Sequence, residues 1–229
     1  MHSPVRPTGV TYPAEAATTR VQGVVRIKGE PPSRKRIDLS GFPSCEKVFG
    51  ESGLFDDSLI VGPNKGVQNV LVYISEFPAA WSFAQDAEVI QVVHDRCSFQ
   101  PKVLGVQVGQ TVEVRITSTV RHADRFISAF QAKVGAEFPY KNVVRMVPKT
   151  PEIFCKIICD VHPWELGLVS VFDHPFFAIT DNKGGFSFPA KLPPGLYKVT
   201  AIHERLQSIE TELRIAGDKE YIELELAYN

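Results

Sequence analysis

Residues 155–167, CKIICDVHPWELG, bring two thiols, an imidazole and the carboxylate of Glu165 close together. Cys159 ends an apolar stretch predicted as a strand, and His162 follows three residues later on a turn that Pro163 tightens. A strand end followed by a short loop can direct a sulfur and an imidazole nitrogen at one point. With a histidine from another strand, these residues would form the two-histidine, one-cysteine ligand set that suits copper in electron transfer.

His122 is our candidate for the histidine from another strand. It follows the segment TVEVRIT (111–117), in which apolar and charged residues alternate as in a half-buried strand. The cysteines Cys45 and Cys97 lie far from the other two in the sequence. They could pair as a disulfide, which would favour an oxidising compartment, or remain as two buried free thiols.

The bulk properties of the chain argue against several functions. The 229 residues carry 25 Lys and Arg against 26 Asp and Glu, and no basic stripe argues for nucleic acid or an acidic membrane surface. With 44% hydrophobic residues and no apolar run of bilayer length, we expect a soluble globular protein without a membrane span. The N-terminus lacks the apolar core of a signal peptide, which fits a cytosolic protein or a mature exported form.

Strand signals predict an all-β scaffold around these residues. Residues 1–19 are predicted to be a flexible arm, followed by strands at VQGVVRIKG (21–29) and VQNVLVYIS (67–75). Turn signals then separate three more strands in 176–204. Between these two groups, six strands indicate a small β-sandwich or Greek-key barrel, namely 89–99, 103–109, 111–117, 142–148, 153–160 and 166–172.

Two segments of the chain together resemble a cupredoxin. They are FQPKVLGVQVGQTVEVRITSTVRHAD (99–124) and CDVHPWELGLVSVF (159–172), and the resemblance covers residues 88–173. The family has a histidine on the loop after a strand pair and a closing Cys-x-x-His-x-x-Met ligand loop. The resemblance implies a cupredoxin-like Greek-key β-barrel that binds one copper ion through His122, Cys159 and His162.

The flanking segments are similar to a carboxypeptidase regulatory-like, transthyretin-type β-sandwich. Its signatures, T-D-x-x-G-x-F and P-P-G-x-Y, match residues 180–186 and 193–197. This implies a sandwich split between 20–80 and 174–229, with the barrel inserted in it or packed beside it. The arrangement is similar to bacterial periplasmic proteins of the methylamine-utilisation or plastocyanin-like type. We therefore expect a periplasmic or extracellular protein that works in electron transport with a redox or envelope protein partner.

The sequence departs from the cupredoxin pattern in the first ligand loop and at the axial position. Residues 117–119 replace the usual Asn-x-Asp, His122 arrives one residue early, and Ala123 replaces an asparagine that would tie the loop. Glu165 stands where the axial methionine is expected. A carboxylate is hard and anionic, so it would favour Cu(II) over Cu(I) and lower the reduction potential. It would also suit zinc, so zinc or no metal remains an alternative to copper.

Cys155 could take part in the site or lie in the core. The spacing Cys155-x₃-Cys159 is similar to the cysteines of the dinuclear purple copper centre, although two residues rather than three separate Cys159 from His162. Residues four apart in a regular strand lie about 13 Å from each other. A buried core thiol is the favoured interpretation of Cys155.

The leading hypothesis is an exported copper protein that transfers single electrons and is not an enzyme. Asp56, Asp57 and Asp181 lie in predicted turns, and Glu204 beside His203 lacks a nucleophile partner, so catalysis finds little support. The competing hypothesis is a metal-free structural or assembly module of a cell-envelope complex that retains the cupredoxin scaffold. Glu165 and the altered loop at 117–123 favour this alternative.

Overall fold

The computed structural model describes residues 10–129 and 143–229, and it confirms the all-β class predicted from the sequence. Strands in these ranges form three four-stranded sheets, one three-stranded sheet and one two-stranded pair. The chain divides into two compact units. We call Ser33–Asp57 with Gln85–Phe172 the central unit, and Met1–Pro32 with Ser58–Ala84 and Asp173–Asn229 the flanking unit.

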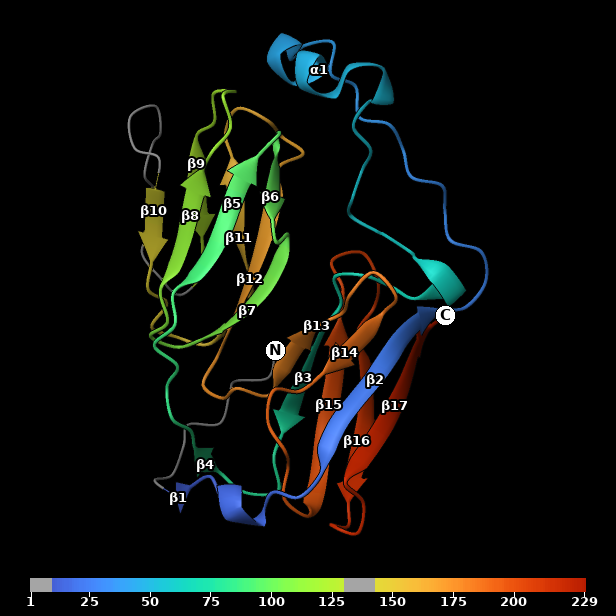
Figure 1. The fold of residues 1–229 in the computed structure, drawn as a ribbon, viewed down its shortest axis with the longest axis vertical. Helices are drawn as coiled ribbons and strands as arrows, with labels where there is room; N and C mark the ends of the chain where they lie inside the picture. The colour runs from blue at the N-terminus through green and yellow to red at the C-terminus, as the bar shows by residue number, and fades with distance from the viewer. Residues whose placement is uncertain (1–9, 130–142) are drawn as a thin grey trace. The chain divides into compact units, whose positions relative to one another are not determined.

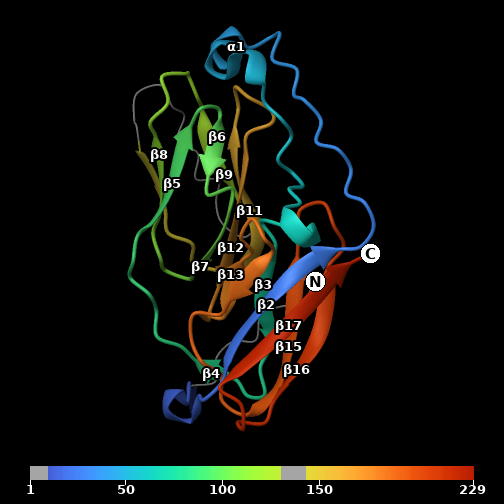
Figure 2. The same cartoon turned by 45° about the vertical axis from the view of Figure 1, so that its right-hand side comes forward.

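The central unit is a sandwich of two four-stranded sheets, which Figures 1 and 2 show one behind the other. The first has the order β10-β8-β5-β6 and the second β7-β12-β11-β9. Alternate apolar side chains of both sheets, such as Val114 and Ile157, meet in one core. The strands are β5 (Ile90–Asp95), β6 (Ser98–Gln100), β7 (Val103–Gln107), β8 (Val112–Ile116), β9 (Asp124–Ile127), β10 (Val143–Met146), β11 (Glu152–Cys159) and β12 (Leu166–Phe172).

In the central unit, one predicted strand is divided into two, and one strand was not predicted. Residues 89–99, predicted as one strand, contain the antiparallel pair β5 and β6. Arg96 and Cys97 form the turn with φ of 45° and 57°, a left-handed conformation that the apolar flanks do not signal. Strand β9 was not predicted, because its four residues include two charged ones and are held by pairing with β11.

The segment 33–57, which the sequence assigned to the split sandwich, belongs to the central unit instead. It contains a short helix that was not predicted, α1 (Pro43–Phe49), followed by the 3₁₀ turn η2 (Gly50–Ser52). Pro43 begins the helix and Gly50 ends it, which is the usual asymmetry of helix ends. A disulfide joins Cys45 of α1 to Cys97. Among the described residues, no helix is long and apolar enough to cross a membrane.

The flanking unit packs two further sheets around its own core. The sheets have the orders β13-β3-β15-β16 and β14-β2-β17. Asp181 closes the turn before β14 by accepting hydrogen bonds from the backbone of Lys183 and Gly185, both at 2.8 Å. The strands are β2 (Arg20–Ile27), β3 (Leu71–Glu76), β13 (Phe177–Ile179), β14 (Gly185–Ser187), β15 (Gly195–Ile202), β16 (Ile209–Ile215) and β17 (Tyr221–Tyr228), with the 3₁₀ turn η3 (Pro63–Lys65).

Part of the predicted N-terminal arm is structured. Residues 1–9 lie outside the described residues, but β1 (Val10–Thr11) pairs with β4 (Trp81–Ser82), and the 3₁₀ turn η1 (Ala14–Ala16) follows. Tyr12 packs against Trp81 and donates a hydrogen bond to the backbone oxygen of Lys191. Aromatic packing thus fixes a segment whose prolines suggested flexibility.

The buried His174 should make the flanking unit sensitive to acid. Its Nδ1 accepts a hydrogen bond from the Phe176 backbone at 3.1 Å, and burial lowers the pKa of His174 from 6.5 to about 3. Below pH 6.5 the unfolded chain therefore binds a proton that the folded chain does not. We expect His174 to reduce the free energy of unfolding by about 1.4 kcal/mol for each pH unit below 6.5.

Denaturant unfolding between pH 7 and pH 4.5 measures this loss. The variant His174→Gln, which has no imidazole to protonate, should show a flatter pH profile than the wild type. Equal slopes for the two proteins would show that His174 does not set the acid sensitivity.

Candidate metal centre

The segment from Cys159 to Glu165 forms a tight loop between two strands. Cys159 is the last residue of β11, and Glu165 directly precedes β12. The backbone N–H of Glu165 donates to the carbonyl of His162 at 3.1 Å, and the N–H of Cys159 donates to the carbonyl of Glu165 at 3.4 Å. These bonds fold the loop back on itself, so that the side chains of all three residues are buried.

Backbone contacts of Ala123 join the His122 loop to this ligand loop. The N–H of Ala123 donates to the Cys159 sulfur at 3.4 Å, and its carbonyl accepts from the N–H of Asp160 at 2.8 Å. An ion pair at 2.7 Å between Arg125 and Asp160 lies beside them. The sequence suggested that Ala123 leaves the loop untied, but the backbone supplies the tie that a side chain was expected to make.

The structure brings His122, Cys159, His162 and Glu165 together. One donor atom from each residue lies within 4.8 Å of the others. The Cys159 Sγ atom is 3.8 Å from Nδ1 of both His122 and His162. The Glu165 carboxylate lies 3.2 Å from His122 Nδ1 and 3.1 Å from His162 Nδ1. His122 and Cys159, which are 37 positions apart in the sequence, thus direct their donor atoms at one buried point.

These distances fit the size of a single metal ion. Metal bonds of 2.0 Å to nitrogen and 2.3 Å to sulfur in a tetrahedral site separate the donors by about 3.5 Å. The thiol and the carboxylate lie 3.1 to 3.8 Å from the two imidazoles, which is close to that value. A thiol with two imidazoles and a carboxylate is also a donor set that copper and zinc both accept.

Glu165 is a buried carboxylate enclosed by imidazoles. Burial alone would raise the pKa of Glu165, but hydrogen bonds from His122 and His94 outweigh it and lower the pKa to about 2. The carboxylate is therefore anionic at neutral pH. Its charge compensates cationic groups placed around it, whether these are imidazolium groups or a metal ion.

The thiol of Cys159 is held in its protonated form when no metal is bound. Burial, with Glu165 beside it, raises the pKa of Cys159 to about 12. Burial also lowers the pKa of His162, which favours the neutral imidazole that metals bind. Because the thiolate is the form that binds metals, binding at this site must release the thiol proton.

His94 is a residue of the centre that the sequence interpretation missed. It lies on β5, its side chain is fully buried, and its Nδ1 is 2.8 Å from Asp124 Oδ2. Its Nε2 is 3.1 Å from Glu165 Oε2. Burial alone would lower the pKa of His94, but the two carboxylates raise it to about 9. An available signal was the alternation of β5, which directs His94 inward on the same face as Val92.

The segment 33–57 covers the outer edge of His162. The Cys45 sulfur of the disulfide lies 3.4 Å from His162 Nε2, and the Phe42 ring packs at 5.6 Å from the imidazole. Trp164 packs on Phe42 at 4.7 Å and donates a hydrogen bond to the carbonyl of Cys97. We call α1, the disulfide, Phe42 and Trp164 the cover. It reduces the exposed fraction of His162 to 3%.

The remaining free cysteine, Cys155, lies in the core of the central unit. It is buried with Val169 and Ile157, and it belongs to neither group of donor atoms that could hold a metal. The second such group includes Cys45 and Cys97, whose sulfurs are joined in the disulfide. The structure therefore offers one thiol to the centre, that of Cys159.

Comparisons with known proteins return partial structural similarities only. A scan against protein-family models finds no match, and a search of curated proteins finds none. Among solved structures, the chain is similar to the copper-containing nitrite reductase from Thermus scotoductus SA-01, with 23% identity and a TM-score of 0.32. The match covers 43% of this chain and 25% of the reductase, so the chain spans about a quarter of that protein.

Two smaller solved proteins match along most of their length. A purple cupredoxin from Nitrosopumilus maritimus is 22% identical, with a TM-score of 0.30 over 36% of this chain and 99% of that one. An oxidised mutant of amicyanin is 20% identical, with a TM-score of 0.33 over 44% of this chain and 98% of that one. These neighbours are cupredoxins. The ligand assignment depends on the donor atoms of this chain alone.

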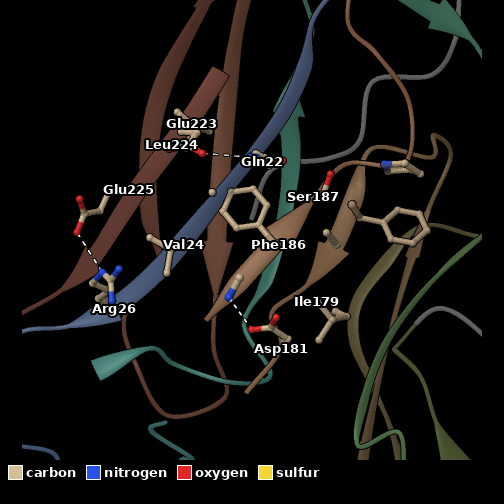
Figure 3. Close-up of a pocket in the computed structure, with 15 residues that line it drawn as sticks. Gln22, Val24, Arg26, Ile179, Asp181, Phe186, Ser187, Glu223, Leu224 and Glu225 are labelled. Carbon is tan, nitrogen blue, oxygen red and sulfur yellow. Dashed lines mark hydrogen bonds and ion pairs between the residues drawn. The ribbon is translucent and has the colours of Figure 1, made fainter. Parts of the chain in front are cut away.

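A separate pocket in the flanking unit lacks metal-binding chemistry. Its volume is about 1030 Å³, and Figure 3 shows side chains of β2, β14 and β17 around it. Its charged groups are already paired: Arg26 lies 3.3 Å from Glu225, and Gln22 donates to Glu223. None of the described residues that line the pocket is a histidine or a cysteine. Among the described residues, the groups of donor atoms that could hold a metal thus lie in the central unit.

Proposed function

We propose that the protein is an exported copper-binding electron-transfer protein. His122, Cys159 and His162 would hold the ion, with Glu165 as a fourth ligand where typical cupredoxins have a methionine. The observation that carries this proposal is the meeting of one thiol, two imidazoles and one carboxylate in a buried cluster within 4.8 Å. A copper ion held there would supply one-electron Cu(I)/Cu(II) chemistry.

The scaffold suits electron transfer because it limits rearrangement of the ligands. Cys159 is anchored at the end of a strand that pairs on both sides, with β12 and β9. The backbone N–H of Ala123 directs a hydrogen bond at the sulfur, a contact that tunes a metal thiolate. Burial of all four ligand side chains keeps water out of the centre.

Replacing Glu165 by methionine should raise the reduction potential of the copper-loaded protein. A neutral thioether stabilises Cu(I) relative to the anionic carboxylate. A hundredfold change in the preference for Cu(I) corresponds to roughly 120 mV. Voltammetry of the wild type should show one reversible one-electron wave, and that of Glu165→Met a wave at higher potential. No reversible wave in the copper-loaded wild type would contradict the electron-transfer role.

An exported location is part of the proposal. The disulfide between Cys45 and Cys97 supports it, because disulfides persist in oxidising compartments. We also propose that the flanking unit is the carboxypeptidase regulatory-like sandwich that its turn motifs resemble, and that it or the cover binds a redox or envelope partner. Mass spectrometry of protein isolated from cells should find these two cysteines oxidised.

A metal-free assembly module is the second candidate function. It is favoured by the contacts of Glu165 with three imidazoles, among which His94, whose pKa is raised to about 9, can compensate the charge of the carboxylate without a metal. In that case the cluster would be a polar network within the core. Elemental analysis of protein purified from its natural source distinguishes the two, since only the first candidate predicts about one copper per chain.

A further inference from the structure

We propose that His94, oriented by Asp124, is the positioning residue that holds the Glu165 carboxylate in the centre. This inference rests on the proposed function, since it concerns the ligand geometry of the same site. It assigns a role to a buried histidine outside the cupredoxin-like ligand set.

The argument begins with the contacts of the two Glu165 oxygens. Oε1 lies 3.1 Å from His162 Nδ1. Oε2 lies between two imidazoles, 3.2 Å from His122 Nδ1 and 3.1 Å from His94 Nε2. Three imidazole nitrogens therefore surround one carboxylate. Only the contact with His94 comes from a residue outside the ligand set.

The His94 contact is the one that can persist when a metal is bound. The Nδ1 atoms of His122 and His162 also face the Cys159 sulfur, each at 3.8 Å, so they are the atoms that would bind the ion. A nitrogen that binds a metal no longer donates a hydrogen bond to Glu165. Of the three imidazole contacts, that leaves the 3.1 Å contact of His94 Nε2 to hold Oε2, while Oε1 faces His162.

His94 is itself fixed from several sides. Its Nδ1–H donates to Asp124 Oδ2 at 2.8 Å, and Asp124 is paired across the β-ladder with Cys159. The imidazole stacks on Phe99, with ring centroids 4.1 Å apart, and on His122 at 3.8 Å. Because β5 and β9 belong to opposite sheets, the chain Asp124–His94–Glu165 connects both sheets of the sandwich to the centre. Outer-shell partners of this kind orient the ligands of metal sites.

Two substitutions of His94 separate its hydrogen bond with Asp124 from its contact with Glu165. In His94→Asn the short amide can replace Nδ1 towards Asp124 but does not reach Glu165, whereas in His94→Gln the longer amide can replace Nε2. We expect His94→Asn to weaken Cu(II) binding by about 10- to 100-fold and His94→Gln to restore most of it. The electron paramagnetic resonance spectrum of Cu(II)-loaded His94→Asn should approach that of Glu165→Ala.

A double variant tests whether the effect passes through Glu165. Adding His94→Asn to Glu165→Ala should change neither the affinity nor the spectrum further. The inference is overturned if His94→Asn leaves both the Cu(II) affinity and the spectrum unchanged. It is also overturned if His94→Asn changes them as much in the Glu165→Ala protein as in the wild type. Should His94→Asn fail to fold, Asp124→Asn replaces it, since this change leaves the imidazole in place but weakens its orientation. We expect Asp124→Asn to shift the spectrum in the same direction as His94→Asn, by a smaller amount.

The metal-free protein separates this inference from the proposed function. If His94 holds Glu165, the effects of His94→Asn and Glu165→Ala on the free energy of unfolding should be coupled, and additive effects would overturn the inference. A folded wild type that binds no Cu(II) would overturn the proposed function instead. The coupling in the metal-free chain would still decide whether His94 holds the carboxylate.

Discussion

Cys159→Ser should abolish the strong visible absorption of the Cu(II)-loaded protein and weaken Cu(II) binding by at least a hundredfold, or about 3 kcal/mol. The absorption arises from charge transfer between a thiolate and Cu(II), and Cys159 is the one free thiol in the described donor group. A hydroxyl of similar size keeps the fold but provides no thiolate ligand. Absorption spectroscopy and a competition titration with a chelator measure the two effects.

Cys155→Ala is the matched control for this prediction. Cys155 is on the same strand and is also a buried free thiol, but it lies in the core with Ile157 and Val169. The variant should keep the absorption band and the affinity of the wild type while losing some stability, because a small cavity forms in the core. Equal loss of the band in both variants would show that the absorption reports folding rather than ligation by Cys159.

The double variant Cys45→Ser with Cys97→Ser should lower the free energy of unfolding by about 4 kcal/mol. The disulfide closes a loop of 52 residues, and the loss of this restraint on the unfolded chain predicts that magnitude. The cover should also open more often, because the disulfide fixes α1 beside His162. A chelator should then remove copper on the order of tenfold faster than from the wild type.

Denaturant unfolding and stopped-flow chelation measure these two effects. Treatment of the wild type with a reductant should reproduce both, and the double variant should not respond to the reductant. An unchanged rate of copper removal, together with the expected loss of stability, would show that the segment 33–57 remains in place without its disulfide. The cover would then not depend on the cross-link.

The parts of the centre that could be predicted are those whose geometry is local. Cys159, His162 and Glu165 lie within seven residues on one loop, so their spacing alone suggested a common point. Including His122 in the ligand set needed one further step, because it follows a different predicted strand, the one that became β8. The role of His94 could not be predicted from spacing, because β5 is brought beside Glu165 only by the packing of the two sheets.

The parts of the fold that were missed depend on long-range contacts or on turn conformation. The segment 33–57 is rich in Gly and Ser, and its place in the central unit depends on the disulfide and on Phe42 packing against Trp164. Helix α1 is too short for a hydrophobic stripe to identify it, although Pro43 and Gly50 mark its ends. The all-β class, by contrast, follows from alternation that each strand carries by itself.

The most direct test of the central claim is a titration of the folded, metal-free wild-type protein with Cu(II), followed by visible absorption and electron paramagnetic resonance. The account predicts saturation at one ion per chain and an intense thiolate-to-copper band. It also predicts a spectrum that changes when Glu165 is replaced by methionine. A fully folded protein that binds no Cu(II), or that binds it without a thiolate band, would contradict the assignment of Cys159, His122 and His162 as a copper centre.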